Sequence, residues 1–218
     1  MPLTSALHFS LQGFLVSVFL RMNKMGLVIC IGIIGIYGCK QKGSDKEKEG
    51  DFFPVASFLQ SQVKDIDTSV YPLMKIITVD SVSDTAYIKR EEFRNYANDF
   101  ITIPDISTGK LKDQYTETKL YDETLKQAIL DYTAKDANAE IRREEVMLVP
   151  DENTGGHVKS IFISRLVNSN DSTVQKNMYW QVNKRFQIVT ITQKSNQPDK
   201  IKTVQVIWND FPTRSSME

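Results

Sequence analysis

Cysteine and histidine are scarce in this chain of 218 residues, with two of each. Cys30 lies inside an apolar run and His8 lies near the start, so only Cys39 and His157 occur beyond residue 38. Two such residues cannot form a disulfide framework or a zinc site with several histidine and cysteine ligands. His157 follows Gly156, which predicts a solvated turn residue in preference to a catalytic base.

Motifs with a defined chemistry are also missing. The sequence contains no GxSxG, no HExxH and no glycine loop that would cradle a phosphate. The loop that starts at Asp151 resembles the beginning of a calcium loop, but its twelfth position is Phe162 where a carboxylate is required. Glu144-Glu145 predicts a strand segment with one solvated side chain. We therefore assign no catalytic residue, metal or cofactor, and an enzyme is the less favoured reading.

A long apolar run is absent too, and the run that is present is short. Gly26 to Tyr37 is apolar and follows Lys24, whereas a membrane-spanning helix needs about 20 apolar residues. A basic start, a short apolar stretch and a small residue at Gly38 are typical of a cleaved signal peptide. We expect residues 22–38 to be that signal, and residues 1–21 to come from a start site called too far upstream.

The end of this run, Ile36-Tyr37-Gly38-Cys39, resembles the lipobox of bacterial lipoproteins. The resemblance implies cleavage before Cys39 and attachment of lipid to its sulfur, so that the membrane is the first partner. Residues 40–50 contain no apolar side chain, so residues 39–50 predict a flexible tether with a reach of about 20 Å. In lipoproteins an Asp after the cysteine retains the protein at the inner membrane. Lys40 stands here, which implies the outer membrane with the leaflet left open.

The layout as a whole is similar to that of envelope lipoproteins of Bacteroidota. The O-glycosylation motif of that group is Asp, then Ser or Thr, then a small apolar residue or Thr. It matches at Ser81, Thr85 and Ser172. The resemblance makes these three hydroxyls candidate modification sites.

The charge balance excludes a general attraction to nucleic acid. The full chain has 27 basic and 27 acidic side chains, and loss of Arg21 and Lys24 with residues 1–38 leaves a net charge of about −2. No block of Lys or Arg stands out, so we expect no nucleic-acid partner.

The hydrophobic pattern predicts one α+β domain over residues 51–211, followed by a disordered tail at 212–218. Apolar residues at helical spacing predict helices over 53–66, 91–101 and 117–135, and a β-branched pattern predicts a hairpin over 74–79 and 85–88. Beyond Asp136 the period falls to two. The pattern there predicts an antiparallel meander of about five strands, over 140–149, 158–167, 173–182, 186–193 and 201–208. In outline this element order is similar to NTF2-like folds, with cystatin-like folds as the alternative.

Three residues are candidates for lining a pocket in such a fold: Arg165, Trp180 and Trp208. Arg165 shares its alternation row with Ile161 and Ile163, so it points inward unless a bulge or an edge position redirects it. Both tryptophans fit a core equally well. These observations favour a membrane-anchored envelope lipoprotein whose domain binds an unknown protein or small molecule without catalysis. A hydrolase or isomerase with a cone-shaped pocket, and a structural subunit of an envelope assembly, remain alternatives.

Overall fold

The structure, a computed structural model, describes residues 51–151, 155–169 and 171–211. The chain divides into two units, Met1–Gly50 and Asp51–Glu218, and the described residues all belong to the second. The signal peptide, the tether, Cys39 and the tail at 212–218 lie outside the described residues and stay predictions.

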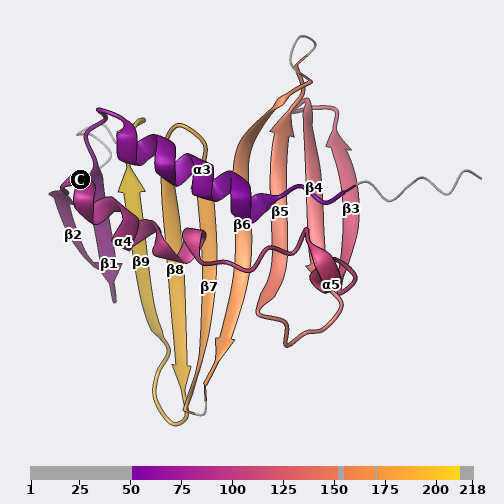
Figure 1. The fold of residues 1–218 in the computed structure, drawn as a ribbon. Helices are drawn as coiled ribbons and strands as arrows, with labels where there is room; N and C mark the ends of the chain where they lie inside the picture. The colour runs from indigo at the N-terminus through magenta and orange to yellow at the C-terminus, as the bar shows by residue number, and fades with distance from the viewer. Residues whose placement is uncertain (1–50, 152–154, 170, 212–218) are drawn as a thin grey trace, which may run out of the picture. The chain divides into compact units, whose positions relative to one another are not determined.

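The described residues form one antiparallel sheet of nine strands in the order β2-β1-β9-β8-β7-β6-β5-β4-β3 (Figure 1). Strands β3 to β9 follow one another as a meander, and the β1–β2 hairpin joins its far end by pairing β1 with β9. The strands are β1 (Met74–Val79), β2 (Val82–Tyr87), β3 (Tyr115–Asp122), β4 (Gln127–Ala134), β5 (Ile141–Val149), β6 (His157–Asn168), β7 (Ser172–Gln181), β8 (Arg185–Lys194) and β9 (Lys200–Ile207).

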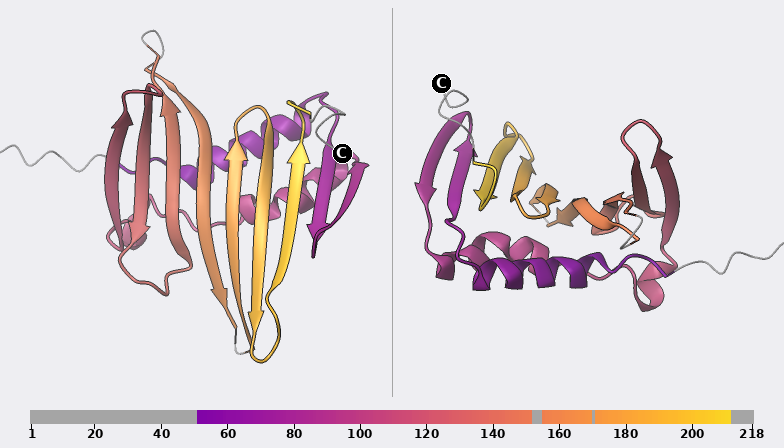
Figure 2. Two further views of the ribbon diagram at one scale, coloured as in Figure 1. Left: turned by 180° about the vertical axis from the view of Figure 1, so that it is seen from behind. Right: turned by 90° about the horizontal axis from the view of Figure 1, so that it is seen from above.

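Helices α3 (Val55–Thr68) and α4 (Arg90–Ile101) lie across the strands on one face of the sheet, and the view from behind shows the other face without a helix (Figures 1 and 2). The connection from β2 to β3 runs through α4, crosses the same face and ends in the short α5 (Gly109–Lys112) near the opposite edge (Figure 1). In α3 the buried residues Val55, Leu59 and Val63 recur at helical spacing. That spacing gives the helix one apolar stripe to place on the sheet.

The expected fold class is wrong. The protein is a nine-stranded antiparallel sheet with few helices, not an α+β layer of about five strands with an NTF2-like or cystatin-like outline. The five C-terminal strands do occur close to their predicted positions, as β5 to β9, and the predicted hairpin corresponds to β1 and β2. The sheet is wider because two further strands occupy residues 115–134 and because the β1–β2 hairpin joins the same sheet through β9.

The helix predicted over residues 117–135 is the hairpin of β3 and β4. Tyr121 and Leu125 supplied part of its helical pattern, yet their side chains are 55% and 61% exposed. The chain reverses at Asp122, whose Oδ1 accepts hydrogen bonds from the backbone N–H groups of Thr124 and Leu125. Such an Asx turn competes locally with a helix. The apolar spacing of three and four residues was therefore coincidental.

Five aromatic rings form a layer between the sheet and α4. Trp180, Phe186 and Trp208 come from the sheet side, and Phe93 and Phe100 come from α4; each of them is at most 1% exposed. Phe100 meets Trp180 edge-on with ring centroids 5.2 Å apart, and Trp180 stacks on Phe186 at 5.5 Å. These contacts hold α4 on the sheet, because aromatic rings bury a large apolar area and favour offset or edge-on geometry.

We expect Phe100→Ala to lower the free energy of unfolding by roughly 3–5 kcal/mol, because it removes a ring from a packed layer and leaves a cavity. Urea unfolding monitored by tryptophan fluorescence measures this, since both tryptophans are retained. Tyr121→Ala, at an exposed position of β3, should change the value by no more than about 0.5 kcal/mol. Equal effects of the two substitutions would contradict the assigned role of the aromatic layer.

Candidate functional site

The strands β6 to β9 extend beyond α4, so that part of the helix-bearing face of the sheet is left uncovered (Figure 1). Pairing places Arg165 of β6 beside Lys176 of β7, then Thr190 of β8 and Lys202 of β9 in one row. This row lies on the helix side, because side chains alternate between faces and Met178, two residues from Lys176, is fully buried there. The row therefore brings three cations together at the edge of α4.

Arg165 takes part in an ion-pair network at this edge. Its Nη2 lies 2.6 Å from Glu140 Oε1, and its Nη1 lies 3.6 Å from Asp99 Oδ1 on α4. The same Asp99 oxygen accepts a 2.6 Å hydrogen bond from Lys176 Nζ. The side chain of Arg165 is 16% exposed and points to the helix side of the sheet, the direction that its alternation with Ile161 and Ile163 indicates. Asp99 thus fixes two cations in place.

A groove of about 560 Å³ lies beside this network. Its walls are Asn95, Tyr96 and Asp99 of α4 together with residues of β7, β8 and β9, among them Lys176, Ile188, Thr190, Lys202 and Val204. A second pocket of about 460 Å³ lies farther along the same strands, where Thr192 and Lys200 pair at the next position of the same face. It is also lined by Asp80, Lys194, Gln197, Pro198 and Asp199.

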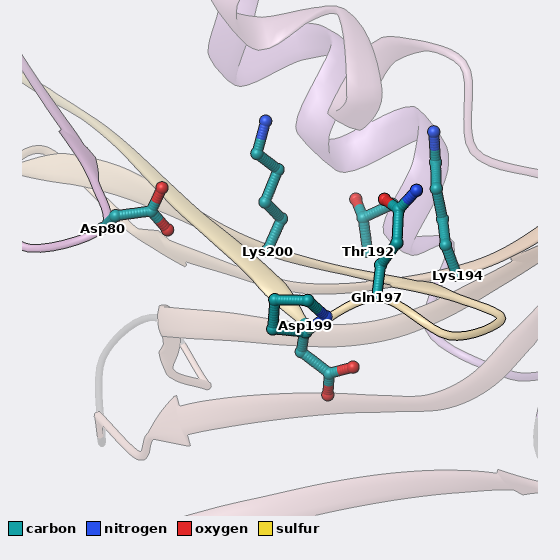
Figure 3. Close-up of a pocket in the computed structure, with 7 residues that line it drawn as sticks. Asp80, Thr192, Lys194, Gln197, Asp199 and Lys200 are labelled. Atoms are coloured by element: carbon teal, nitrogen blue, oxygen red, sulfur yellow. The ribbon is translucent and has the colours of Figure 1, made fainter.

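The close-up of the second pocket shows how its charges are arranged. Lys194, Lys200, Thr192 and Gln197 rise on the side of the sheet that carries the helices, whereas Asp199 points to the opposite side (Figure 3). Asp199 accepts a hydrogen bond from Gln193 at 3.0 Å there. We call the two adjoining pockets the lysine groove, defined by Lys176, Lys194, Lys200 and Lys202. The pocket beside α4 is the inner half of this groove, and the second pocket is its outer half. Asp80 is the acidic side chain that lies beside the lysines of the outer half.

The two candidate tryptophans lie away from this groove. Trp180 and Trp208 are 0% and 1% exposed, with ring centroids 5.2 Å apart inside the aromatic layer. Neither indole N–H has a hydrogen-bond partner within the described residues. They support α4, which forms one wall of the groove, so their link to the site is indirect.

The remaining candidates lie at turns and edges. Ser81 stands in the tight β1–β2 turn, where Asp80 and Ser81 have φ of 46° and 73°, and it is exposed. Thr85 is exposed on the edge strand β2, and Ser172 begins β7 with its hydroxyl 3.0 Å from that of Ser169. His157 is exposed as the first residue of β6. Ser81 and Thr85 are therefore open to solvent, while Ser172 is hydrogen bonded.

Glu144 is a further residue of interest, which sequence reasoning treated as an ordinary strand position. Its side chain on β5 is 1% exposed, and neither carboxylate oxygen has a hydrogen-bond partner among the described residues. It pairs across the sheet with Tyr132 on one side and Ile163 on the other, both fully buried. A buried carboxyl without a partner is rare, because an ionised group loses its hydration there.

The surroundings of Glu144 favour its protonated form. Burial, and to a smaller extent the charge of Asp105, raises the pKa of its carboxyl to about 8. The nearby hydroxyls are engaged elsewhere: Tyr115 donates to the carbonyl of Ile141 at 2.8 Å, and Tyr132 accepts from the backbone N–H of Phe53 at 2.9 Å and is also hydrogen bonded to Glu117. Burial also raises the pKa of both tyrosines to about 12. Glu144 lines neither half of the lysine groove.

Residues 51–151, 155–169 and 171–211 contain no cluster of three or more His, Cys, Asp or Glu side chains placed to hold a metal ion. None of their helices combines the length and the apolar character that crossing a membrane requires.

Comparison with known proteins gives no relative from which to transfer a role. No protein-family model, no curated protein and no solved structure matches the chain.

The lysine groove had only a weak signal in the sequence. Lys194, Lys200 and Lys202 surround a turn, where charged residues usually serve solubility, and Lys176 is a single charge in an alternating strand. Pairing of β7, β8 and β9 brings them together with Asp99, which lies 77 residues before Lys176. Contacts at that separation leave no local pattern.

Glu144 should make the protein less stable as the pH rises. Its folded pKa is raised above the ordinary value of 4.5 to about 8, so the folded state holds a proton that the unfolded state releases between these values. The free energy of unfolding should therefore fall through this range by up to about 1.4 kcal/mol per pH unit and then level off. Glu144→Gln should remove this dependence, as measured by urea unfolding at a series of pH values.

Glu145→Gln is the matched control, because the neighbouring carboxylate pairs with Arg143 at 2.8 Å. It should not remove the downward slope above pH 5. A difference between Glu144→Gln and the parent chain that stays constant with pH would show that Glu144 does not titrate as described.

Proposed function

We propose that this chain is a lipid-anchored protein of the bacterial envelope whose folded domain binds an anionic ligand in the lysine groove without catalysis. One observation carries the proposal: Lys194, Lys200 and Lys202 gather on one face, and within the described residues none of them has an ion-pair partner. Lysines that repel one another at close range are stabilised when an anion binds between them.

The groove has the properties of a binding site for a small molecule. Its two halves, of about 560 and 460 Å³, fall within the range that small ligands occupy. The inner half combines an apolar floor at Ile188 and Val204 with the amide of Asn95 and the hydroxyl of Thr190. These groups can accept and donate hydrogen bonds beside the charge of Lys202. The ligand class that fits is a small molecule with phosphate or carboxylate groups and some apolar surface.

The ion-pair network prepares the site before the ligand arrives. Asp99 neutralises Lys176 and contacts Arg165, and Glu140 holds the other side of the guanidinium. Fixed side chains lose less conformational entropy on binding. The cations at Lys200 and Lys202 are left to interact with the ligand, so we assign them the direct contact.

Binding of sodium tripolyphosphate and of citrate to the full chain tests the proposal by isothermal titration calorimetry. We expect saturable binding of at least one probe, with Lys202→Ala and Lys200→Ala each weakening it about tenfold, because each removes a charge from the groove. Binding should also weaken as salt is added.

Lys64→Ala is the matched control, since Lys64 is an exposed lysine of α3 outside the groove. It should leave the dissociation constant unchanged. Absence of binding of both probes, or an equal loss with Lys64→Ala, would contradict an anion site at the lysine groove.

The anchoring part of the proposal rests on Ile36-Tyr37-Gly38-Cys39, which resembles a lipobox and favours lipidation of Cys39. Lys40, which follows the cysteine, favours the outer membrane. We expect Cys39→Ala to move the protein from the membrane fraction to the soluble fraction of cells, because no sulfur remains at that position to carry lipid. Immunoblotting of the two fractions measures the change.

Cys30→Ala serves as the control for loss of a cysteine, because it stays within the apolar run and keeps that run apolar. It should leave the protein in the membrane fraction. Retention of Cys39→Ala in membranes would show that the chain is held there by other means.

A further inference from the structure

Over strands β1, β2 and β6 to β9, the face of the sheet that carries the helices has more charged side chains than the opposite face. Six cations of strands β1 and β6 to β9 lie on the face that carries the helices: Lys75, Arg165, Lys176, Lys194, Lys200 and Lys202. Lys159 of β6 is exposed at the register shift between β5 and β6 and is not one of them. On the opposite face, Arg185 is the charged residue among the paired positions of β1, β2 and β6 to β9. At the border with β5 this face also carries Glu145, the partner of Phe162, and Arg143, which forms ion pairs with Glu145 and Asp131. A face that only meets water normally carries charged side chains, so this one has the composition of a contact surface.

Amide and aromatic side chains take the place of charge there. Phe162, Tyr179, Gln187 and Gln205 form one row across β6, β7, β8 and β9, with Gln175 and Asn177 beside it on β7. We call these six residues the amide face. The row spans three strand spacings, about 14 Å, and is crossed by no described helix (Figure 2). It is long enough to contact several units of an extended polymer.

Hydrogen-bonding capacity is left open on this surface. Gln175 donates to Asn177 at 3.3 Å, but within the described residues the side-chain amides of Gln187 and Gln205 have no partner. Each offers two N–H donors and a carbonyl acceptor, and each is half-buried. A ligand that covers them must therefore supply both acceptors and donors at short intervals.

We propose that the amide face binds an uncharged glycan. Sugar hydroxyls donate and accept hydrogen bonds, as the amides require, and the weakly positive C–H groups of a sugar ring suit the negative ring faces of Tyr179 and Phe162. An anionic polymer or lipid headgroup would find no cation in the centre of the face. A second copy of the sheet is the alternative occupant, and the oligomeric state measured in the test distinguishes it from a glycan. This site is separate from the lysine groove and does not depend on it.

The test uses the full chain in a detergent without a sugar headgroup, titrated with cellohexaose, maltohexaose and the hexamer of N-acetylglucosamine. We expect at least one of them to bind by calorimetry and to shift the NMR signals of the side-chain amides of Gln187 and Gln205. Tyr179→Ala should weaken binding about tenfold, because the stacking surface is lost. Salt at about 0.5 M should leave the affinity unchanged, since no charge takes part.

Gln205→Lys provides a second variant that leaves the aromatic residues in place, and near-ultraviolet circular dichroism of the tryptophans checks that each variant is folded. Lys200→Ala, on the other face, should bind as the parent chain does. No binding of any hexamer at about 5 mM would overturn the proposal. So would loss of binding in Lys200→Ala with retention in Tyr179→Ala, or a dimer of the parent chain that Gln205→Lys dissociates.

Discussion

Packing of α4 on the sheet through five aromatic rings is the interaction on which the other features depend. Phe93 and Phe100 reach down from the helix to Trp180, Phe186 and Trp208, and all five are withdrawn from water. Because these rings sit toward one end of β7, β8 and β9, the helix covers that end only. The other end of the same strands is left open, and the lysine groove forms where the cover stops.

The same packing separates the sheet into two surfaces with different chemistry. On the helix side, apolar residues fill the part of the face that α4 covers, and lysines occupy the uncovered part. Residues of one strand that share this face are therefore core residues at one end and charged residues at the other. On the other side, amides and rings continue across β6 to β9 and are bordered at β5 by the ion pairs of Arg143 with Asp131 and Glu145. The two proposed binding surfaces, one for anions and one for neutral hydroxyl groups, are chemically compatible because their recognition groups do not overlap.

Burial of Glu144 lowers the stability of the fold, because its carboxyl has no hydrogen-bond partner among the described residues. The segment between α4 and β3 crosses the sheet and buries Ile103 and Ile106, and the charge of its Asp105 acts on Glu144. The usual compensation for a buried carboxyl is a cation or several hydrogen bonds. Glu144 has neither among the hydrogen bonds of the described residues, so its carboxyl is stabilised by protonation. The free energy of unfolding therefore depends on pH.

Local patterns in the sequence determined α3, α4, the β1–β2 hairpin and the five C-terminal strands, because apolar periodicity and turn residues act over short distances. For Arg165 the same reasoning left an inward position and a redirected one both open. It failed for residues 115–134, where Tyr121 and Leu125 imitate a helical stripe and the Asx turn at Asp122 decides otherwise. Only the tertiary structure decided three features: the width of the sheet, the ion pair between Asp99 and Lys176, and the burial of Glu144. Each arises from contacts between residues far apart in the chain. The energies of these contacts depend on the strand register and on which elements cover the sheet, and neither can be inferred from a local sequence pattern.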